Sequence, residues 1–146
     1  MLSTLIISDL HLTNVELDKV KLFENFCNEQ ASKVDQLFIL GDLFNSWIGD
    51  DASLSNFKVI TSILKDLSEK TNVFVMAGNR DFLLSNSFEK ETGCKIIKEP
   101  HLLNHNEKNY LLIHGDSLCT DDADYQKLKK VLRNPIIQFI FLHLPK

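Results

Sequence analysis

The segment VFVMAGNRDFLL, residues 73–84, joins an apolar run directly to the polar residues Asn79, Arg80 and Asp81. Because its apolar part does not alternate with polar side chains, it indicates a strand buried on both faces, as in a parallel sheet. Ligands bind beyond the carboxyl ends of such strands. The polar cluster that follows Gly78 therefore predicts a functional edge of the sheet.

Three other apolar runs have the same organisation. LIIS (5–8), LFIL (37–40) and YLLI (110–113) also read as buried strands, and helical spacing separates them over residues 17–31 and 57–67. A β-α-β-α-β order of this kind is typical of an α/β sheet. We expect a further helix at 86–92, a short hairpin of KIIK and HLLNH, and a helix from about Asp122 to before Pro135.

Each apolar run ends in potential metal ligands: Asp9 and His11, Asp42, Asn79, and His114. One Gly-Asp after a strand is usually only a turn, but four such clusters in series make coincidence improbable. Carboxylate, amide and imidazole groups together suit Mn²⁺, Mg²⁺, Fe or Zn²⁺. Two such ions about 4 Å apart can activate a water for phosphoryl displacement, and Asp42 is the expected bridge between them.

The composition fits one soluble domain or part of one. The chain has 146 residues, 44% of them hydrophobic, and a net charge of −4, so broad nucleic-acid binding is not expected. Its three cysteines lack CxxC spacing, which favours a reducing, cytoplasmic setting without disulfides. The apolar stretch 136–144 is too short to span a bilayer.

The order DxH, GD, GN and H resembles the calcineurin-like metallophosphoesterase superfamily, which implies an α/β fold with a β-sandwich flanked by helices. The longer blocks ISDLHL (7–12), ILGDLFNSWIGDD (39–51), GNRDFLL (78–84) and HGDSLCTDDADYQ (114–126) resemble the UDP-2,3-diacylglucosamine hydrolases of Gram-negative bacteria. That family cleaves the pyrophosphate of UDP-2,3-diacylglucosamine to UMP and 2,3-diacylglucosamine 1-phosphate (lipid X) in lipid A biosynthesis.

The resemblance implies two divalent ions, with Mn²⁺ favoured. Asp9 and His11 would hold one ion, Asn79 and His114 the second, and Asp42 would bridge both. The implied catalytic residues are Asp42, Asn79, Arg80 and His114. Arg80 replaces the histidine common in the wider superfamily; it cannot act as an acid near neutral pH, but its planar fork suits a diphosphate.

The resemblance implies substrate binding by Asn79, Arg80, Asp122 and Tyr125. The acidic residues near Asp122 are equally well explained as the start of a helix. Asp81 is expected to orient its neighbours, while Trp47 either packs in the core or lines the site, which the sequence does not decide.

The resemblance also predicts that this chain is the N-terminal portion of a longer enzyme, with C-terminal strands missing. Five of seven implied ligand positions are present, and there is no Gly-His-x-His motif. Residues 1–134 would form the incomplete metallophosphoesterase domain and 135–146 the start of a truncated helical cap. We expect weak Mn²⁺ binding and impaired activity from such a fragment.

Because the substrate is a lipid, the resemblance further implies peripheral contact with the cytoplasmic face of the inner membrane, and no nucleic-acid partner. Two alternatives stay open at this point. One is a metallophosphoesterase of another phosphate ester, and the other is a non-catalytic remnant that keeps the motifs without the activity.

Overall fold

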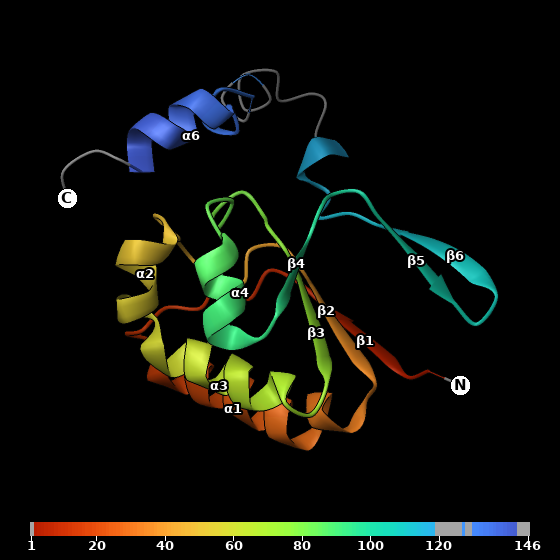
Figure 1. Cartoon of the computed structure of the whole chain (residues 1–146). Coiled ribbons are helices and arrows are strands. Elements are labelled where there is room, and N and C mark those ends of the chain that lie inside the picture. The colour runs from red at the N-terminus through yellow and green to blue at the C-terminus, as the bar shows by residue number, and fades with distance from the viewer. Residues whose placement is uncertain (1, 119–126, 128–129, 143–146) are drawn as a thin grey trace. The chain divides into compact units, whose positions relative to one another are not determined.

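The computed structural model describes residues 2–118, 127 and 130–142. The chain divides into two compact units, Met1–His114 (unit 1) and Gly115–Lys146 (unit 2), which are described separately. Unit 1 contains both sheets and most of the helices (Figure 1).

A four-stranded parallel sheet forms the centre of unit 1, in the order β1-β2-β3-β4. Its in-register pairing places Ile7 beside Ile39 and Ile39 beside Val75, so the first three strands end at one edge. The three apolar runs of the N-terminal half therefore form the predicted parallel sheet. The bounds of its strands are Thr4–Ile7 (β1), Gln36–Leu40 (β2), Asn72–Met76 (β3) and Lys95–Ile97 (β4).

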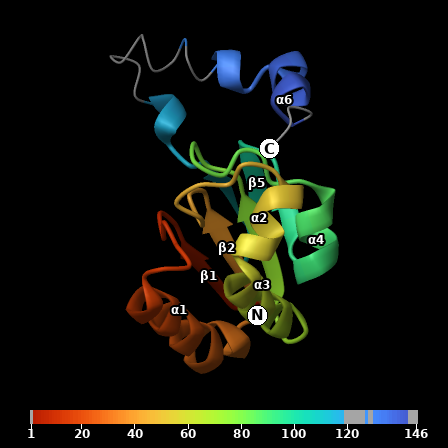
Figure 2. The same cartoon turned by 90° about the vertical axis from the view of Figure 1, so that its left-hand side faces the viewer.

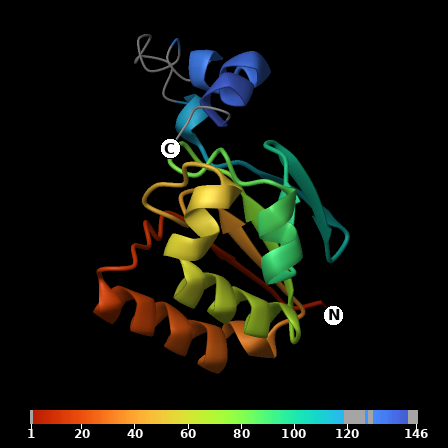
Figure 3. The same cartoon turned by 60° about the vertical axis from the view of Figure 1, so that its left-hand side comes forward.

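Four helices cover one face of this sheet (Figures 2 and 3). Helix α3 buries Ile60, Ile63, Leu64 and Leu67 on one side, as its helical spacing predicts. Helix α4 is the predicted helix at 86–92, and it ends at Gly93 in the left-handed conformation that favours glycine. The bounds are Leu17–Glu29 (α1), Asp50–Asn56 (α2), Lys58–Ser68 (α3) and Asn86–Thr92 (α4), with a 3₁₀ turn at Ala31–Lys33 (η1).

Helix α2 was not predicted, because the sequence DDASLSN has no apolar periodicity. It leads into α3 next to an aromatic cluster of Phe44, Trp47, Phe57 and Phe88. Trp47 is only 2% exposed. The structure thus resolves the open alternative for Trp47, which packs in the core.

A two-stranded antiparallel sheet, β5 (His101–His105) and β6 (Lys108–Leu112), lies on the face opposite the helices (Figure 1). Leu103 and Leu112 pack there against Phe38 and Met76 of the parallel sheet. The predicted hairpin of KIIK with HLLNH is wrong: residues 95–97 pair in parallel with β3, whereas 101–105 pair with β6.

The expectation that the run at 110–113 is buried on both faces is also wrong. Leu112 is buried, but the other residues of β6 are exposed. The reason is that β6 belongs to a two-stranded hairpin, separate from the parallel sheet, and only one face of this hairpin packs against the core.

Unit 2 contains a 3₁₀ turn, Asp116–Leu118 (η2), and the helix α6, Pro135–Leu142. Within this unit the Asp116 carboxylate lies 3.7 Å from the Arg133 guanidinium. Most of the helix predicted between Asp122 and Pro135 falls outside the described residues, although residues 130–132 are helical. Among the described residues, no helix combines the length and apolar character needed to cross a bilayer.

Candidate metal centre

The ends of β1 and β2 continue side by side past the last strand residues. The backbone N–H of Asp9 donates to the Gly41 carbonyl (3.1 Å), and that of His11 donates to the Asp42 carbonyl (2.9 Å). These bonds hold the DxH and GD segments next to each other. The sheet edge therefore brings together ligand candidates that are more than 30 residues apart in the sequence.

Three of the candidate ligands have a positive φ angle, a backbone conformation that residues other than glycine rarely adopt. The φ angles are 56° at Asp9, 47° at His11 and 51° at Asp42. Such conformations cost about 1–3 kcal/mol each and concentrate at functional sites. Their coincidence around one carboxylate indicates that the loops are shaped for ligand binding.

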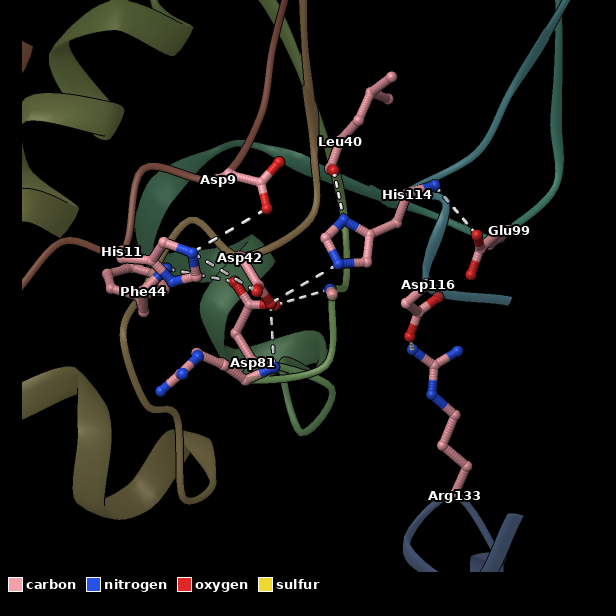
Figure 4. A network of polar contacts seen from close by, with 12 residues as sticks. Asp9, His11, Leu40, Asp42, Phe44, Asp81, Glu99, His114, Asp116 and Arg133 are labelled. Atoms are coloured by element: carbon pink, nitrogen blue, oxygen red, sulfur yellow. Dashed lines mark hydrogen bonds and ion pairs between the residues drawn. The ribbon is translucent and has the colours of Figure 1, made fainter. Parts of the chain in front are cut away.

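Asp42 stands at the centre of the cluster and is almost completely buried. His11 Nε2 lies 3.8 Å from its Oδ2 and 4.0 Å from Asp9 Oδ1, while His114 Nε2 lies 4.0 Å from Asp42 Oδ1 (Figure 4). One ligand atom each from Asp9, Asp42 and His114 falls within 4.8 Å of the others. The 3.8–4.0 Å separations are about twice a metal–ligand bond of roughly 2.0–2.2 Å, which is the spacing of atoms that can share a cation, and Asp42 faces both histidines.

The orientation of His114 is set by two hydrogen bonds. Its Nδ1 lies 2.9 Å from the Leu40 carbonyl, and its backbone N–H donates to Glu99 Oε1 at 3.0 Å. Since a carbonyl only accepts, Nδ1 carries a proton, which leaves Nε2, the nitrogen on the Asp42 side, as the atom that could bind a metal. This is the carbonyl–histidine arrangement found behind metal-ligating imidazoles.

The two ring nitrogens of His11 lie in different surroundings. Its Nδ1 is buried and, within the part of the chain that the structure describes, has no hydrogen-bond partner. Buried polar atoms are nearly always satisfied, and exceptions need an explanation. The other ring nitrogen, Nε2, faces Asp9 and Asp42 and is therefore the atom of His11 that is placed to bind a cation.

Asn79 lies directly against the Asp42 carboxylate. With its amide nitrogen turned inward, that nitrogen is 2.6 Å from Oδ2 and 3.0 Å from Oδ1. The same position allows the amide oxygen to face a cation shared with Asp42. The chemistry of the set, carboxylate, amide and imidazole, suits hard and borderline divalent ions.

Gly78 and Gly41 permit this close packing. A Cβ at Gly78 would collide with the Asp42 carboxylate and backbone nitrogen, and one at Gly41 would collide with the His114 ring. Gly41 also has a positive φ of 87°. Both glycines are therefore required by the close approach of ligand candidates.

Asp81 and Asp42 connect the loop after β2 with the loop after β3, because each carboxylate accepts a hydrogen bond from the backbone of the other loop. Asp42 Oδ1 accepts the Arg80 N–H (3.0 Å), while Asp81 accepts the N–H groups of Gly78 (2.7 Å) and Phe44 (3.2 Å). Burial raises the pKa of the Asp81 carboxyl, and these backbone hydrogen bonds oppose that rise. The contacts agree with the orienting role expected of Asp81.

The structure thus brings together all five predicted ligands, Asp9, His11, Asp42, Asn79 and His114, with Arg80 exposed beside them. One part of the prediction needs correction: His114 does not follow a strand of the same sheet, but arrives from β6. Asp122 and Tyr125 lie outside the described residues. Sequence reasoning missed Glu99, which anchors the His114 backbone and has no motif to mark it.

The sequence model of the calcineurin-like phosphoesterase family matches residues 2–143, so the chain belongs to this family. Members of the family depend on divalent metals. The cluster at the strand ends is therefore a candidate metal centre of a metallophosphoesterase.

Two curated relatives are similar over nearly all of the chain. A UDP-2,3-diacylglucosamine hydrolase from Azotobacter vinelandii is 43% identical over 99% of this chain and 60% of its own length. One from Pseudomonas fluorescens is 44% identical over 97% of this chain and 57% of its own length. The chain thus spans about three fifths of the length of the relatives it matches.

A solved structure, the nuclease MPE of Pseudomonas putida, aligns with a TM-score of 0.52 at 17% identity. The alignment covers 68% of this chain and 49% of the nuclease chain. At this identity the likeness concerns the fold alone.

Proposed function

We propose that this chain carries the metal centre of a UDP-2,3-diacylglucosamine hydrolase, which cleaves the pyrophosphate to UMP and 2,3-diacylglucosamine 1-phosphate in lipid A biosynthesis. The observation that carries the proposal is the buried Asp42 carboxylate facing His11 and His114 in a chain of the calcineurin-like family. The relatives named above support the choice of substrate.

In this proposal Asp9, His11, Asp42, Asn79 and His114 hold two divalent cations, Mn²⁺ being the favoured ion. When bound, such ions make a nucleophilic water available at neutral pH and offset charge on phosphoryl oxygens. This proposal is supported by the hydrogen bond of His114 Nδ1 to the Leu40 carbonyl, which leaves Nε2 as the ligating atom, and by Asp42, which faces both His11 and His114.

Arg80 is proposed to bind the diphosphate. Its side chain is exposed, and its backbone N–H is fixed on Asp42, the shared ligand candidate. A guanidinium forms paired, charge-assisted hydrogen bonds with phosphate oxygens and does not release a proton near neutral pH. Arg80 therefore stabilises charge rather than protonating the leaving group. Asp122 and Tyr125 remain proposed substrate contacts.

We expect only weak activity from these 146 residues, because they supply five of the seven ligand positions that the resemblance implies. The test measures UMP release from UDP-2,3-diacylglucosamine with millimolar Mn²⁺, beside release of nitrophenol from p-nitrophenyl phosphate. Slow, metal-dependent UMP release is expected, lost in Asp42→Asn and kept in Asp66→Asn, which changes an exposed carboxylate of α3.

Two outcomes would contradict this proposal. Faster hydrolysis of the aryl phosphate than of the lipid nucleotide would favour a phosphoesterase of another substrate. Failure of Mn²⁺ to bind at all would favour a non-catalytic remnant.

Membrane contact is proposed on the basis of α6. Its sequence PIIQFIFL is apolar almost throughout, and Ile136, Phe139 and Ile140 are each more than half exposed. Such a helix can bury apolar side chains at a bilayer surface. The proposal places the protein on the cytoplasmic face of the inner membrane.

Sedimentation with vesicles of anionic phospholipid tests this contact. Ile140→Glu is expected to reduce the bound fraction several-fold, since it places a charge on the apolar helix. Ser87→Glu is the control, because it adds the same charge to an exposed position of α4. Equal binding of both variants would exclude α6 as the contact.

A further inference from the structure

Asp50 is a buried carboxylate that the metal centre does not use. It is 7% exposed and begins α2. Its Oδ1 accepts hydrogen bonds from Trp47 Nε1 (3.0 Å) and the Ser85 backbone (3.1 Å). Its Oδ2 accepts from Ser85 Oγ (2.6 Å) and the Phe88 backbone (2.8 Å). Four donors thus converge on one carboxylate.

Asp50 takes the place of a local cap for α4. Ser85 is the N-cap residue of α4, but its side chain makes no capping hydrogen bond to the helix. Asp50 instead accepts the N–H of Phe88, 38 residues further along the chain. The carboxylate thereby ties the segment after the GD motif to the segment after the GN motif.

The same network reaches Arg80 through Trp47. The Trp47 backbone N–H donates to the Arg80 carbonyl (3.0 Å), and the Arg80 N–H donates to Asp42 Oδ1 (3.0 Å). The backbone of Arg80 is therefore held on both sides. One side depends on Asp42, and the other depends on a tryptophan whose indole is held by Asp50.

We propose that Asp50 is a positioning residue, which fixes Trp47 and through it the backbone of Arg80, so that the guanidinium is held ready for a phosphate. The role of Arg80 rests on the proposed function, whereas the effect of Asp50 on the Arg80 backbone does not. The alternative is a purely structural role, in which Asp50 only caps α4.

Amide hydrogen exchange of the 146-residue chain separates these two roles. Asp50→Asn keeps the shape but replaces one acceptor oxygen with a donor group. We expect the Trp47 and Arg80 amides to exchange about tenfold faster relative to those of β2 and β3. Asp66→Asn, the same change at an exposed position of α3, is the control and should leave them unchanged.

The inference is overturned if Ser85 and Phe88 lose protection in Asp50→Asn while Trp47 and Arg80 keep theirs. Trp47 is the single tryptophan of the chain, so its fluorescence gives an independent check. An emission spectrum identical to wild type would show that the indole does not depend on Asp50, and would also count against the proposal.

Calorimetric titration with Mn²⁺ and then with UMP gives the functional readout. Asp50→Asn should change Mn²⁺ affinity less than about twofold and weaken UMP binding about tenfold, with no further loss when combined with Arg80→Ala. Additive losses, or equal weakening of both ligands, would contradict positioning through Arg80. If the wild-type chain binds no UMP, the proposed function fails, while the exchange result still decides the role of Asp50.

Discussion

Asp42 is approached from three sides by side chains that come from different segments of the chain. His11, Asn79 and His114 each have an atom within 4.0 Å of its carboxylate oxygens. The packing is close enough that neighbouring positions tolerate only glycine. At the residue scale, the site therefore depends on the space around one carboxylate as much as on the ligands themselves.

Gly78→Ala tests this dependence. The added methyl group would occupy the position of the Asp42 carboxylate and displace it. We expect Mn²⁺ affinity to fall at least about tenfold, and the free energy of unfolding to fall by about 1–3 kcal/mol. Calorimetry and urea denaturation measure the two effects. Wild-type Mn²⁺ affinity in this variant would show that Asp42 is not placed as described.

The ligand candidates were predictable because each is a polar residue directly after an apolar run. Asp9, Asp42 and Asn79 follow strands of one sheet, and parallel strands end at a common edge. The contacts of Glu99 and Asp50 were not predictable, because they join residues distant in sequence and follow no spacing rule. Trp47 was undecided for the same reason.

At the element scale, the hairpin β5–β6 is the part that sequence reasoning placed wrongly. Periodicity identified the apolar segments, but it does not say which strands pair. KIIK joins the parallel sheet because α4 returns the chain to its edge, whereas HLLNH pairs with the strand that follows it. The pairing was set by tertiary packing on Phe38 and Met76.

Adjacent leucines of β6 test this packing. Leu112 is buried against the sheet, while Leu111 is 64% exposed on the other face of the hairpin. Leu112→Ala should lower the free energy of unfolding by about 2–4 kcal/mol, and Leu111→Ala by less than about 0.5 kcal/mol. Urea denaturation at neutral pH gives both values. Equal losses would mean that the hairpin does not pack as described.

The buried thiols of Cys27 and Cys94 give a second element-scale prediction. Burial raises the pKa of Cys27 to about 12 and that of Cys94 to about 11, from 9.0. Both pKa values are higher in the folded protein than in the unfolded chain. The buried neutral thiols therefore contribute their full stability below pH 9, and this contribution is lost as the pH rises through 11 and 12.

Under reducing conditions, the free energy of unfolding of wild type should therefore fall more steeply between pH 8 and 11 than that of the Cys27→Ala, Cys94→Ala double variant. All other ionisable groups are the same in both proteins, so the difference between the two slopes isolates the two thiols. Parallel pH curves from urea denaturation would contradict the burial of these cysteines.

At the scale of the whole molecule, unit 1 has apolar side chains on its surface beside a strand edge. Ile6, Leu102, Tyr110 and Leu111 are each more than two fifths exposed. Among the described strands, β1 pairs only with β2. Exposed strand edges and apolar patches favour association between molecules.

We therefore expect the 146-residue chain to self-associate as its concentration rises, and Leu111→Lys to shift it toward monomer. Sedimentation velocity at several concentrations measures this equilibrium. A monodisperse monomer with a sharp thermal transition would contradict the expectation.

Two divalent cations are proposed to bind around Asp42. Anomalous X-ray scattering from crystals of the chain soaked in millimolar Mn²⁺ tests it most directly. The account predicts two manganese peaks about 4 Å apart, both next to the Asp42 carboxylate, one on the side of His11 and the other on the side of His114. Manganese bound elsewhere, with no peak beside Asp42, would contradict it.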